Sequence, residues 1–165
     1  MSKINRYQPH IIVLPEDRAN QEIVNGFILA PNVNYRAINI ERPIGGWKKV
    51  VEKFADDIVP LMRQNAYRRV VLLIDFDKRE DRLSYAKNYI PTDLEDRVFI
   101  LGVQSNPESL RKATKKNFEQ LGETLAEGCP NTMNELWEHE LLKHNQSELE
   151  RMSVIVKEIL FNVSK

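Results

Sequence analysis

The chain has 165 residues, which is enough for one domain with a single substantial core. Hydrophobic residues make up 42% of it and charged residues 29%, a balance that is typical of globular proteins and argues against intrinsic disorder. Lysine plus arginine number 24, as do aspartate plus glutamate, so the formal net charge is zero. Any attraction to nucleic acid must therefore come from a local basic patch.

Four apolar runs predict β-strands. Residues 11–14 and 70–74 are continuous apolar runs, so both are expected to be buried on both faces of a sheet. Residues 35–40 alternate polar and apolar side chains, which indicates a half-buried strand and is compatible with an edge position. Residues 98–103 are expected to form a further buried strand.

Helices are expected between and after these strands. Residues 18–27 follow Asp17, which is suited to cap a helix N-terminus. Residues 47–61 keep helical spacing of apolar side chains, and Pro60 is expected to kink or end that helix. Apolar spacing and helix-start signals predict the remaining helices at about 82–89, 108–116, 118–125, 135–145 and 149–160.

This alternation predicts an α/β fold with a mainly parallel four-stranded sheet covered by helices. Residues 1–116 are expected to form a Rossmann-like α/β domain, and residues 117–165 a helical extension packed on the same domain. The extension is expected to cover the sheet or to serve in oligomerisation, for example in a homodimer.

The N-terminal residues contain no apolar signal core, and no apolar run approaches the roughly 20 residues that span a bilayer. The single cysteine, Cys129, cannot form an internal disulfide and has no evident base partner. These features predict a protein of the reducing cytoplasm that does not enter membranes.

Acidic residues follow two of the predicted strands. Glu16 follows the first, and Asp75 and Asp77 follow the third. Ligands of open α/β sheets bind outside the carboxyl ends of the strands. If these strands are neighbours, extended-chain alternation points Asp75 and Asp77 to one side, and all three carboxylates converge on a site that suits Mg²⁺ or Mn²⁺. The alternative is that acids merely end strands at the solvent, since aspartate favours turns.

The order of a strand, Glu16, a helix, a strand, a helix and a strand ending in Asp75-Phe76-Asp77 resembles the TOPRIM domain. That domain occurs in topoisomerases, bacterial primases and OLD-family nucleases, and the likeness is greatest to small stand-alone bacterial TOPRIM-like proteins. The resemblance covers about residues 9–105. It implies that Asp75 and Asp77 bind Mg²⁺ and that Glu16 acts in acid–base chemistry on phosphodiesters or assists the metal.

Some positions depart from the family pattern. Asp17 stands where a glycine often follows the glutamate, and Arg79 stands where topoisomerase-type members often carry a third acid. Nuclease-type members also place an acid after the next strand; Glu108 is available for this role or for stabilising a helix N-terminus. The resemblance therefore implies a fold and a metal site rather than one particular reaction.

In a nuclease of this kind, metal on Asp75 and Asp77 would stabilise charge on the phosphate, while Glu16 orients or deprotonates water or binds a second metal. Basic residues near the acids should position the nucleic-acid backbone. The candidates are Arg18, Lys78, Arg79, Arg82, Arg111 and Lys112. For the last two, a solvated basic helix face is the alternative.

Three functions follow from these interpretations. The first is a Mg²⁺-dependent nuclease, with DNA favoured, an ATPase partner supplying DNA affinity, and a role in defence or mobile elements by analogy. The second is a non-catalytic TOPRIM-like binding or regulatory subunit, which the missing third acid and the zero net charge favour. The third is a small nucleotide phosphohydrolase.

Three other motifs are set aside. His139 and His144 are five residues apart, whereas the zinc-protease motif needs two histidines four apart on one helical face. The Walker B-like residues 71–75 have no accompanying phosphate-binding loop, which excludes a P-loop NTPase. Lys78 follows the Asp-x-Asp sequence where a haloacid-dehalogenase phosphatase normally continues with glycine.

Overall fold

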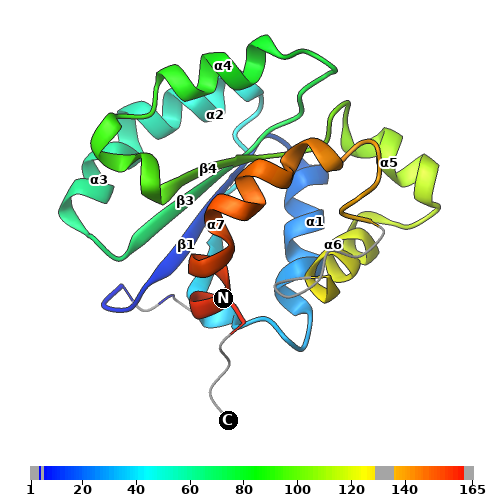
Figure 1. Cartoon of the computed structure of the whole chain (residues 1–165), viewed down its shortest axis with the longest axis horizontal. Helices are drawn as coiled ribbons and strands as arrows, with labels where there is room; N and C mark the ends of the chain where they lie inside the picture. The colour runs from blue at the N-terminus through cyan, green and yellow to red at the C-terminus, as the bar shows by residue number, and fades with distance from the viewer. Residues whose placement is uncertain (1–3, 5, 129–135, 162–165) are drawn as a thin grey trace.

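The sheet is all-parallel. The computed structural model of the protein describes residues 4, 6–128 and 136–161. The described residues form four strands in the order β2-β1-β3-β4, with helices on both faces (Figure 1). The strands are β1 (His10–Pro15), β2 (Ile38–Ile40), β3 (Arg68–Leu73) and β4 (Val98–Leu101). This arrangement confirms the predicted Rossmann-like α/β fold.

Strands β1 and β3 form the centre of the sheet. They pair in parallel from His10 opposite Arg68 to Pro15 opposite Leu73. All of β1 is buried, as expected for an apolar strand that is covered on both faces. Strand β2 lies at one edge and is shorter than predicted, because a 3-10 helix, η1 (Tyr35–Ala37), replaces its first half.

One face of the sheet packs against the helices that follow β2 and β3. Their buried side chains, such as Phe54 and Met62, pack with Leu14 and Leu72 of the sheet. Pro60 does not end the helical segment, because the turn before it widens into a π-helix that accommodates the missing N–H. These elements are α2 (Trp47–Lys53), η2 (Phe54–Ile58), α3 (Val59–Gln64), α4 (Asp81–Asn88) and η3 (Thr92–Arg97).

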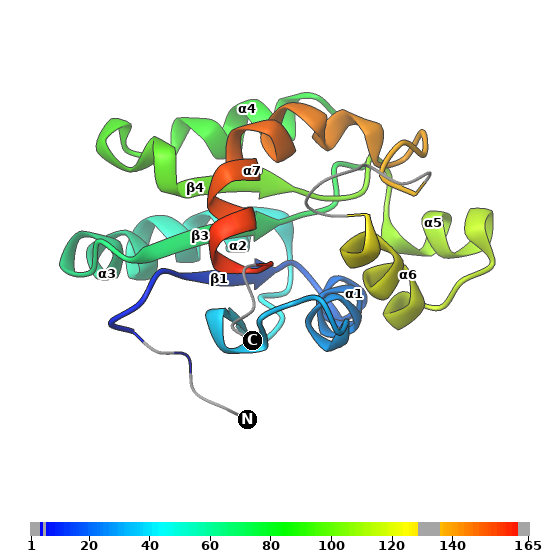
Figure 2. The same ribbon diagram turned by 60° about the horizontal axis from the view of Figure 1, so that its bottom comes forward.

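The opposite face is covered by helices from the two ends of the chain (Figure 2). Helices α1 and α6 approach so closely that a Cβ atom at Gly122 would lie 1.8 Å from the carbonyl oxygen of Ile23. Helix α7 packs Met152 and Ile159 against the sheet. These elements are α1 (Arg18–Leu29), α5 (Pro107–Thr114), α6 (Phe118–Glu127), η4 (Lys143–Asn145) and α7 (Gln146–Ile159).

The helix predicted at 135–145 is wrong for the part that the structure describes. Residues 136–142 form turns, and within the described part of the predicted range the only helical element is the short 3-10 helix η4 at residues 143–145. The backbone is used for loop pairing, since the carbonyl of Leu141 accepts a hydrogen bond from the N–H of Gln104 at 2.8 Å. Leu136, Trp137 and Leu142 are nevertheless buried. The apolar spacing in this segment therefore indicated which residues are buried, but it did not indicate a helix.

No helix within residues 6–128 and 136–161 is long and apolar enough to cross a lipid bilayer. Cys129 lies outside the described residues, so its interpretation as an unpaired thiol stays a prediction.

Candidate metal centre

Two carboxyl groups meet at the carboxyl edge of the sheet because β1 and β3 are neighbours. Glu16 directly follows β1, and its backbone N–H still donates to the carbonyl of Leu73 at 2.9 Å. Its side chain turns toward β3, where Oε2 accepts a hydrogen bond from the backbone N–H of Asp75 at 3.3 Å. Glu16 and Asp75 are only 7% and 8% exposed. The structure thus brings together the two acids that the sequence placed on separate strands.

Asp17 and Asn20 complete the arrangement. Asp17 caps α1 by accepting from the backbone N–H of Asn20 at 2.9 Å, as predicted. The buried side-chain amide of Asn20 also donates to Asp17 Oδ1 at 3.1 Å and to Asp75 Oδ1 at 2.9 Å. One carboxylate oxygen from each of Glu16, Asp17 and Asp75 lies within 4.8 Å of the others. We refer to these three residues as the acid cluster.

The two inner carboxyl groups resist ionisation. Burial raises the pKa of Asp75 to about 8; a hydrogen bond with the Glu16 carboxyl adds to the rise, and the Asn20 amide opposes it. Burial also raises the pKa of Glu16 above its ordinary value, against the effect of its hydrogen bonds with Asp75. The raised pKa of both groups favours a proton held between Glu16 and Asp75 when no cation balances them.

A cation would replace that proton. Among the residues that the structure describes, no lysine or arginine side chain forms an ion pair with a carboxylate of the acid cluster. Metal binding to carboxylates displaces protons and supplies the missing positive charge. Carboxylate oxygens are hard ligands, and hard ligands suit Mg²⁺ or Mn²⁺. The donor set fits the predicted cofactor on these chemical grounds.

Asp77 lies apart from the acid cluster, contrary to the expected convergence. Its side chain is 64% exposed, and its φ of 49° is in the left-handed region, as is that of Lys78 at 56°. This turn ends the alternation of extended chain, so Asp75 and Asp77 do not share one side. Asp77 instead pairs with Arg82, with 3.6 Å between Oδ2 and Nη2.

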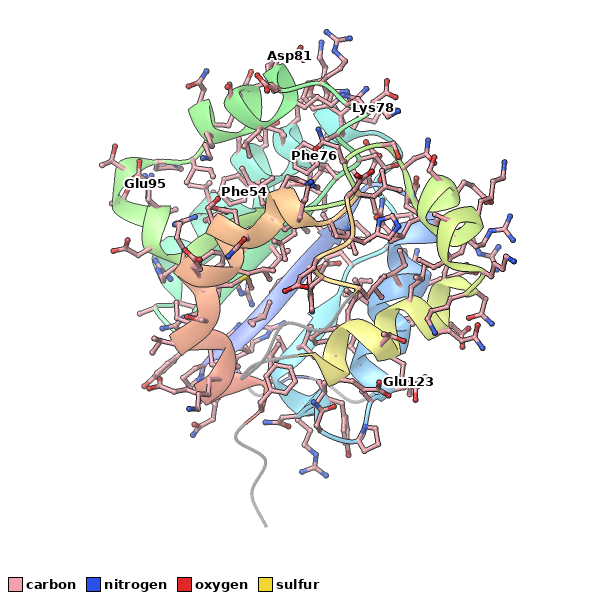
Figure 3. All side chains as sticks on the ribbon, turned by 45° about the vertical axis from the view of Figure 1, so that its right-hand side comes forward. Phe54, Phe76, Lys78, Asp81, Glu95 and Glu123 are labelled. Carbon is pink, nitrogen blue, oxygen red and sulfur yellow. The ribbon has the colours of Figure 1, made fainter. Side chains whose placement is uncertain are left out.

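The end of β3 is held in place from the β4 side. The N–H groups of Ile74 and Phe76 donate to the carbonyls of Leu101 and Val103, each at 3.0 Å. A Cβ atom at Gly102 would lie 1.6 Å from the carbonyl oxygen of Ile74, so only glycine permits this approach. Figure 3 shows Phe76 toward the interior, whereas Lys78 and Asp81 reach the periphery. Asp75 therefore leaves the sheet from a fixed backbone.

His144 and His139 lie in different surroundings, and neither binds metal as part of a helical pair. His144 packs its ring edge-on against Phe76, with 5.0 Å between the ring centroids, and burial lowers its pKa. A neutral, packed imidazole beside the acid-bearing segment was not anticipated from the sequence. His139 lies in the turns of residues 136–142 and accepts from the N–H of Leu141, so the two do not form a helical metal pair.

The predicted basic residues differ in their distance from the acids. Arg82 is the closest, since its Nη1 donates to the backbone carbonyl of Asp75 at 2.7 Å. Arg79 pairs with Asp81 at 2.9 Å, and both side chains are exposed. Lys78 is exposed on the same turn. The structure thus places Arg82 beside the candidate metal centre, and Arg79 and Lys78 on the exposed turn that follows Asp75.

The other basic candidates are solvated. Arg18 is 85% exposed on its side chain and lies 3.5 Å from Glu22, one turn along α1. Arg111 pairs with Glu108 at 2.7 Å on α5, and Lys112 is exposed beside it. Glu108 is thus engaged on a helix surface, and it is not one of the acids in the cluster.

Comparison of this chain with protein-family models, with curated proteins and with solved structures gives no match. The interpretation of the site therefore rests on its geometry. Sequence reasoning missed Asn20 and treated Asp17 only as a helix cap. The available signal was the spacing of Asp17 and Asn20, three residues apart at a helix start directly after Glu16.

Proposed function

We propose that the acid cluster binds Mg²⁺ or Mn²⁺ and that the protein hydrolyses nucleic-acid phosphodiesters in the manner of a TOPRIM-like nuclease, with DNA as the favoured substrate. One observation carries the proposal. Two buried carboxyl groups, Glu16 and Asp75, leave adjacent parallel strands at the edge where α/β folds bind ligands, and no basic side chain in the described part of the chain forms an ion pair with either of them.

Each residue of the site would have a separate role in phosphodiester hydrolysis. A bound cation would supply positive charge to a non-bridging phosphate oxygen. Asp75 would give up its proton and hold the cation, with its orientation set by the Asn20 amide. Glu16 would either orient or deprotonate the attacking water or join Asp75 in binding metal. Arg82, tied to the carbonyl of Asp75, would position the phosphate backbone.

The direct test is metal-dependent cleavage of supercoiled plasmid and of single-stranded DNA and RNA. Wild type should cleave with Mg²⁺ or Mn²⁺, and Asp75→Asn and Glu16→Gln should lose that activity while remaining folded. Asp93→Asn is a matched control, because Asp93 is exposed and pairs with Arg63 away from the acid cluster. Equal cleavage by wild type and by Asp75→Asn would overturn the proposal.

A second function, a non-catalytic binding or regulatory subunit, is favoured by a different observation. Arg82 already pairs with Asp77, so the second acid of the Asp-x-Asp sequence is compensated without a metal. Such a subunit would act with a partner, such as an ATPase that supplies DNA affinity. Metal binding without cleavage, even when a partner ATPase is added, would favour the second function. Cleavage that appears only with the partner and is lost in Asp75→Asn would favour the first. A place in a defence or mobile-element system stays an analogy.

A further inference from the structure

Strand β4 forms the second edge of the sheet. Its neighbour β3 and the residues after it pair with the backbone groups that point toward them. The carbonyls of Leu101 and Val103 accept hydrogen bonds from the N–H groups of Ile74 and Phe76. The alternate residues, 98, 100 and 102, direct their backbone groups away from β3. An open strand edge of this kind is a template for pairing with another strand.

Side chains from the segment at the start of α7 occupy this edge. Asn145 accepts from the N–H of Gly102 at 3.1 Å and donates to its carbonyl at 2.9 Å. Glu148 accepts from the N–H of Ile100 at 2.8 Å. Arg151 donates to the carbonyl of Val98 at 3.5 Å. The outward residues Val98 and Ile100 of β4, and Gly102 directly after it, therefore each have a side-chain partner where a neighbouring strand would offer its backbone.

These partners contact the strand in reverse chain order, from Asn145 at Gly102 through Glu148 at Ile100 to Arg151 at Val98. Asn145, Glu148 and Arg151 are three residues apart, so they lie along one side of the helical segment. Asn145 and Glu148 are 3% and 6% exposed, and Arg151 Nη1 bonds the second carboxylate oxygen of Glu148 at 2.6 Å. Helix α7 begins beside β4 and then crosses the sheet toward β1 (Figures 1 and 2). We refer to these three side chains as the edge cover.

The covered strand is well suited to pair with itself. Residues 98–101 read Val-Phe-Ile-Leu, without charge, proline or glycine, which is the composition of strands that associate when exposed. Antiparallel pairing about a two-fold axis at Ile100 sets Ile100 against Ile100 and Val98 against Gly102 of the second copy. Both backbone groups of Ile100 and Gly102 and the carbonyl of Val98 can then pair across the axis, whereas the N–H of Val98 donates to the carbonyl of Glu95. The other edge, β2, offers only three residues before Glu41 and Arg42.

We propose that the edge cover closes a strand-pairing surface on β4, and that the partner this surface takes when uncovered is β4 of a second copy of the chain. Side-chain bonds replace a neighbouring strand in the closed form. In the open form, two sheets join through their β4 edges into one continuous sheet. This proposal is independent of the metal centre and of the proposed nuclease activity.

The test removes the cover from the full-length chain. The double variant Asn145→Ala/Glu148→Ala should form dimers in sedimentation at concentrations where wild type is monomeric. Hydrogen exchange should show the amides of Ile100 and Gly102 faster in the monomeric variant than in wild type, and protected again in its dimer. Glu148→Gln keeps an acceptor for the N–H of Ile100 and should remain monomeric. Ser147→Ala and Glu150→Ala, exposed on the same helix, are matched controls.

A folded double variant that stays monomeric at every concentration tested would overturn the proposal, as would a dimer in which Ile100 and Gly102 exchange freely. If the double variant does not fold, the single variants Asn145→Ala and Glu148→Ala decide in the same way. In each, the amide that loses its partner should exchange faster, and the dimer fraction should exceed that of wild type.

Discussion

Two buried acids in this molecule have opposite surroundings. Glu148, at the β4 edge, has one carboxylate oxygen on Arg151 and the other on a backbone N–H. Asp75, at the carboxyl edge, faces Glu16, Asp17 and a neutral amide. Burial is nearly equal at the two sites, with 6% and 8% exposure.

The difference lies in where the compensating charge comes from. At Glu148 the chain supplies its own cation, Arg151, so the charge of the carboxylate is balanced and both of its oxygens have hydrogen-bond partners. At Asp75 the chain supplies another acid, so a proton or an external cation must balance the charge. A buried acid is therefore informative about function only after its partners are known, and of these two only Asp75 points to a ligand.

The largest expected effect tests the structural acid. Arg151→Ala leaves the buried carboxylate of Glu148 without its cation, and we expect the free energy of unfolding to fall by about 2 to 3 kcal/mol, less than for a fully buried pair because the Arg151 side chain is 41% exposed. Urea denaturation measures this loss. Arg111→Ala, which removes an exposed pair of similar length to Glu108, should cost less than about 1 kcal/mol. Equal losses in the two variants would break the comparison.

The second effect is the pH dependence of stability that Asp75, the buried acid without a paired cation, should cause. The folded pKa of Asp75 is raised to about 8 from 3.8, so the folded state holds a proton that the unfolded state releases. Its stabilising contribution is complete below the unfolded pKa and is lost as the pH rises through the folded pKa. In metal-free buffer, Asp75→Asn should become more stable than wild type across this range, by about 2 kcal/mol or more near its upper end.

Thermal or urea unfolding of wild type and Asp75→Asn at a series of pH values measures that difference. Taking the difference between the two proteins cancels the titration of all other groups that the substitution leaves unchanged. Parallel stability profiles would show that Asp75 ionises normally and would remove the contrast with Glu148.

The third effect is the stabilisation of the folded protein when Mg²⁺ or Mn²⁺ is added. With EDTA removed and Mg²⁺ or Mn²⁺ present at about ten times its Kd, binding to the folded state should raise the free energy of unfolding by about 1.4 kcal/mol. The gain should vanish in Asp75→Asn and persist in Asp93→Asn. Calorimetric unfolding with and without EDTA provides the measurement. A wild type whose unfolding neither metal changes would indicate that a proton, and not a metal ion, balances the charge of Asp75.

The smallest effect separates the two roles of Asp17. Asparagine caps helices about as well as aspartate, so Asp17→Asn should change the metal-free stability by less than about 0.5 kcal/mol. The same substitution removes a negative oxygen from the acid cluster and should weaken Mg²⁺ binding in a titration. Unchanged Mg²⁺ affinity would restrict Asp17 to capping and leave Glu16 and Asp75 as the ligands.

The sequence placed Glu16 and Asp75 at the carboxyl ends of two strongly apolar strands, where ligands of such sheets bind. That the two strands are neighbours was only implied by the TOPRIM resemblance, and the structure shows that they are. The sequence could not place Asp77. The left-handed turn there depends on non-local pairing, since the N–H groups of Asp77 and Lys78 donate to the carbonyls of Ser105 and Gln104. Local alternation alone predicts the opposite.

The edge cover escaped prediction for a related reason. Residues 135–145 and 149–160 were each expected to be helical, which treats Asn145 as a helix end and Glu148 as part of a connection. Only the tertiary position of α7 beside β4 shows that these polar side chains point inward. Short-range patterns predicted the sheet and most helices, whereas polar residues with distant partners required the fold.

Gly102 also sets a rule for reading the sequences of distant relatives. A side chain there would meet the backbone of Ile74 and the ring of Phe76, immediately before and after Asp75. A homologue that retains the function of Glu16 and Asp75 should therefore retain a glycine one position after its fourth strand, even where the surrounding apolar residues have drifted. We therefore expect the glycine to be retained together with the two acids in such homologues.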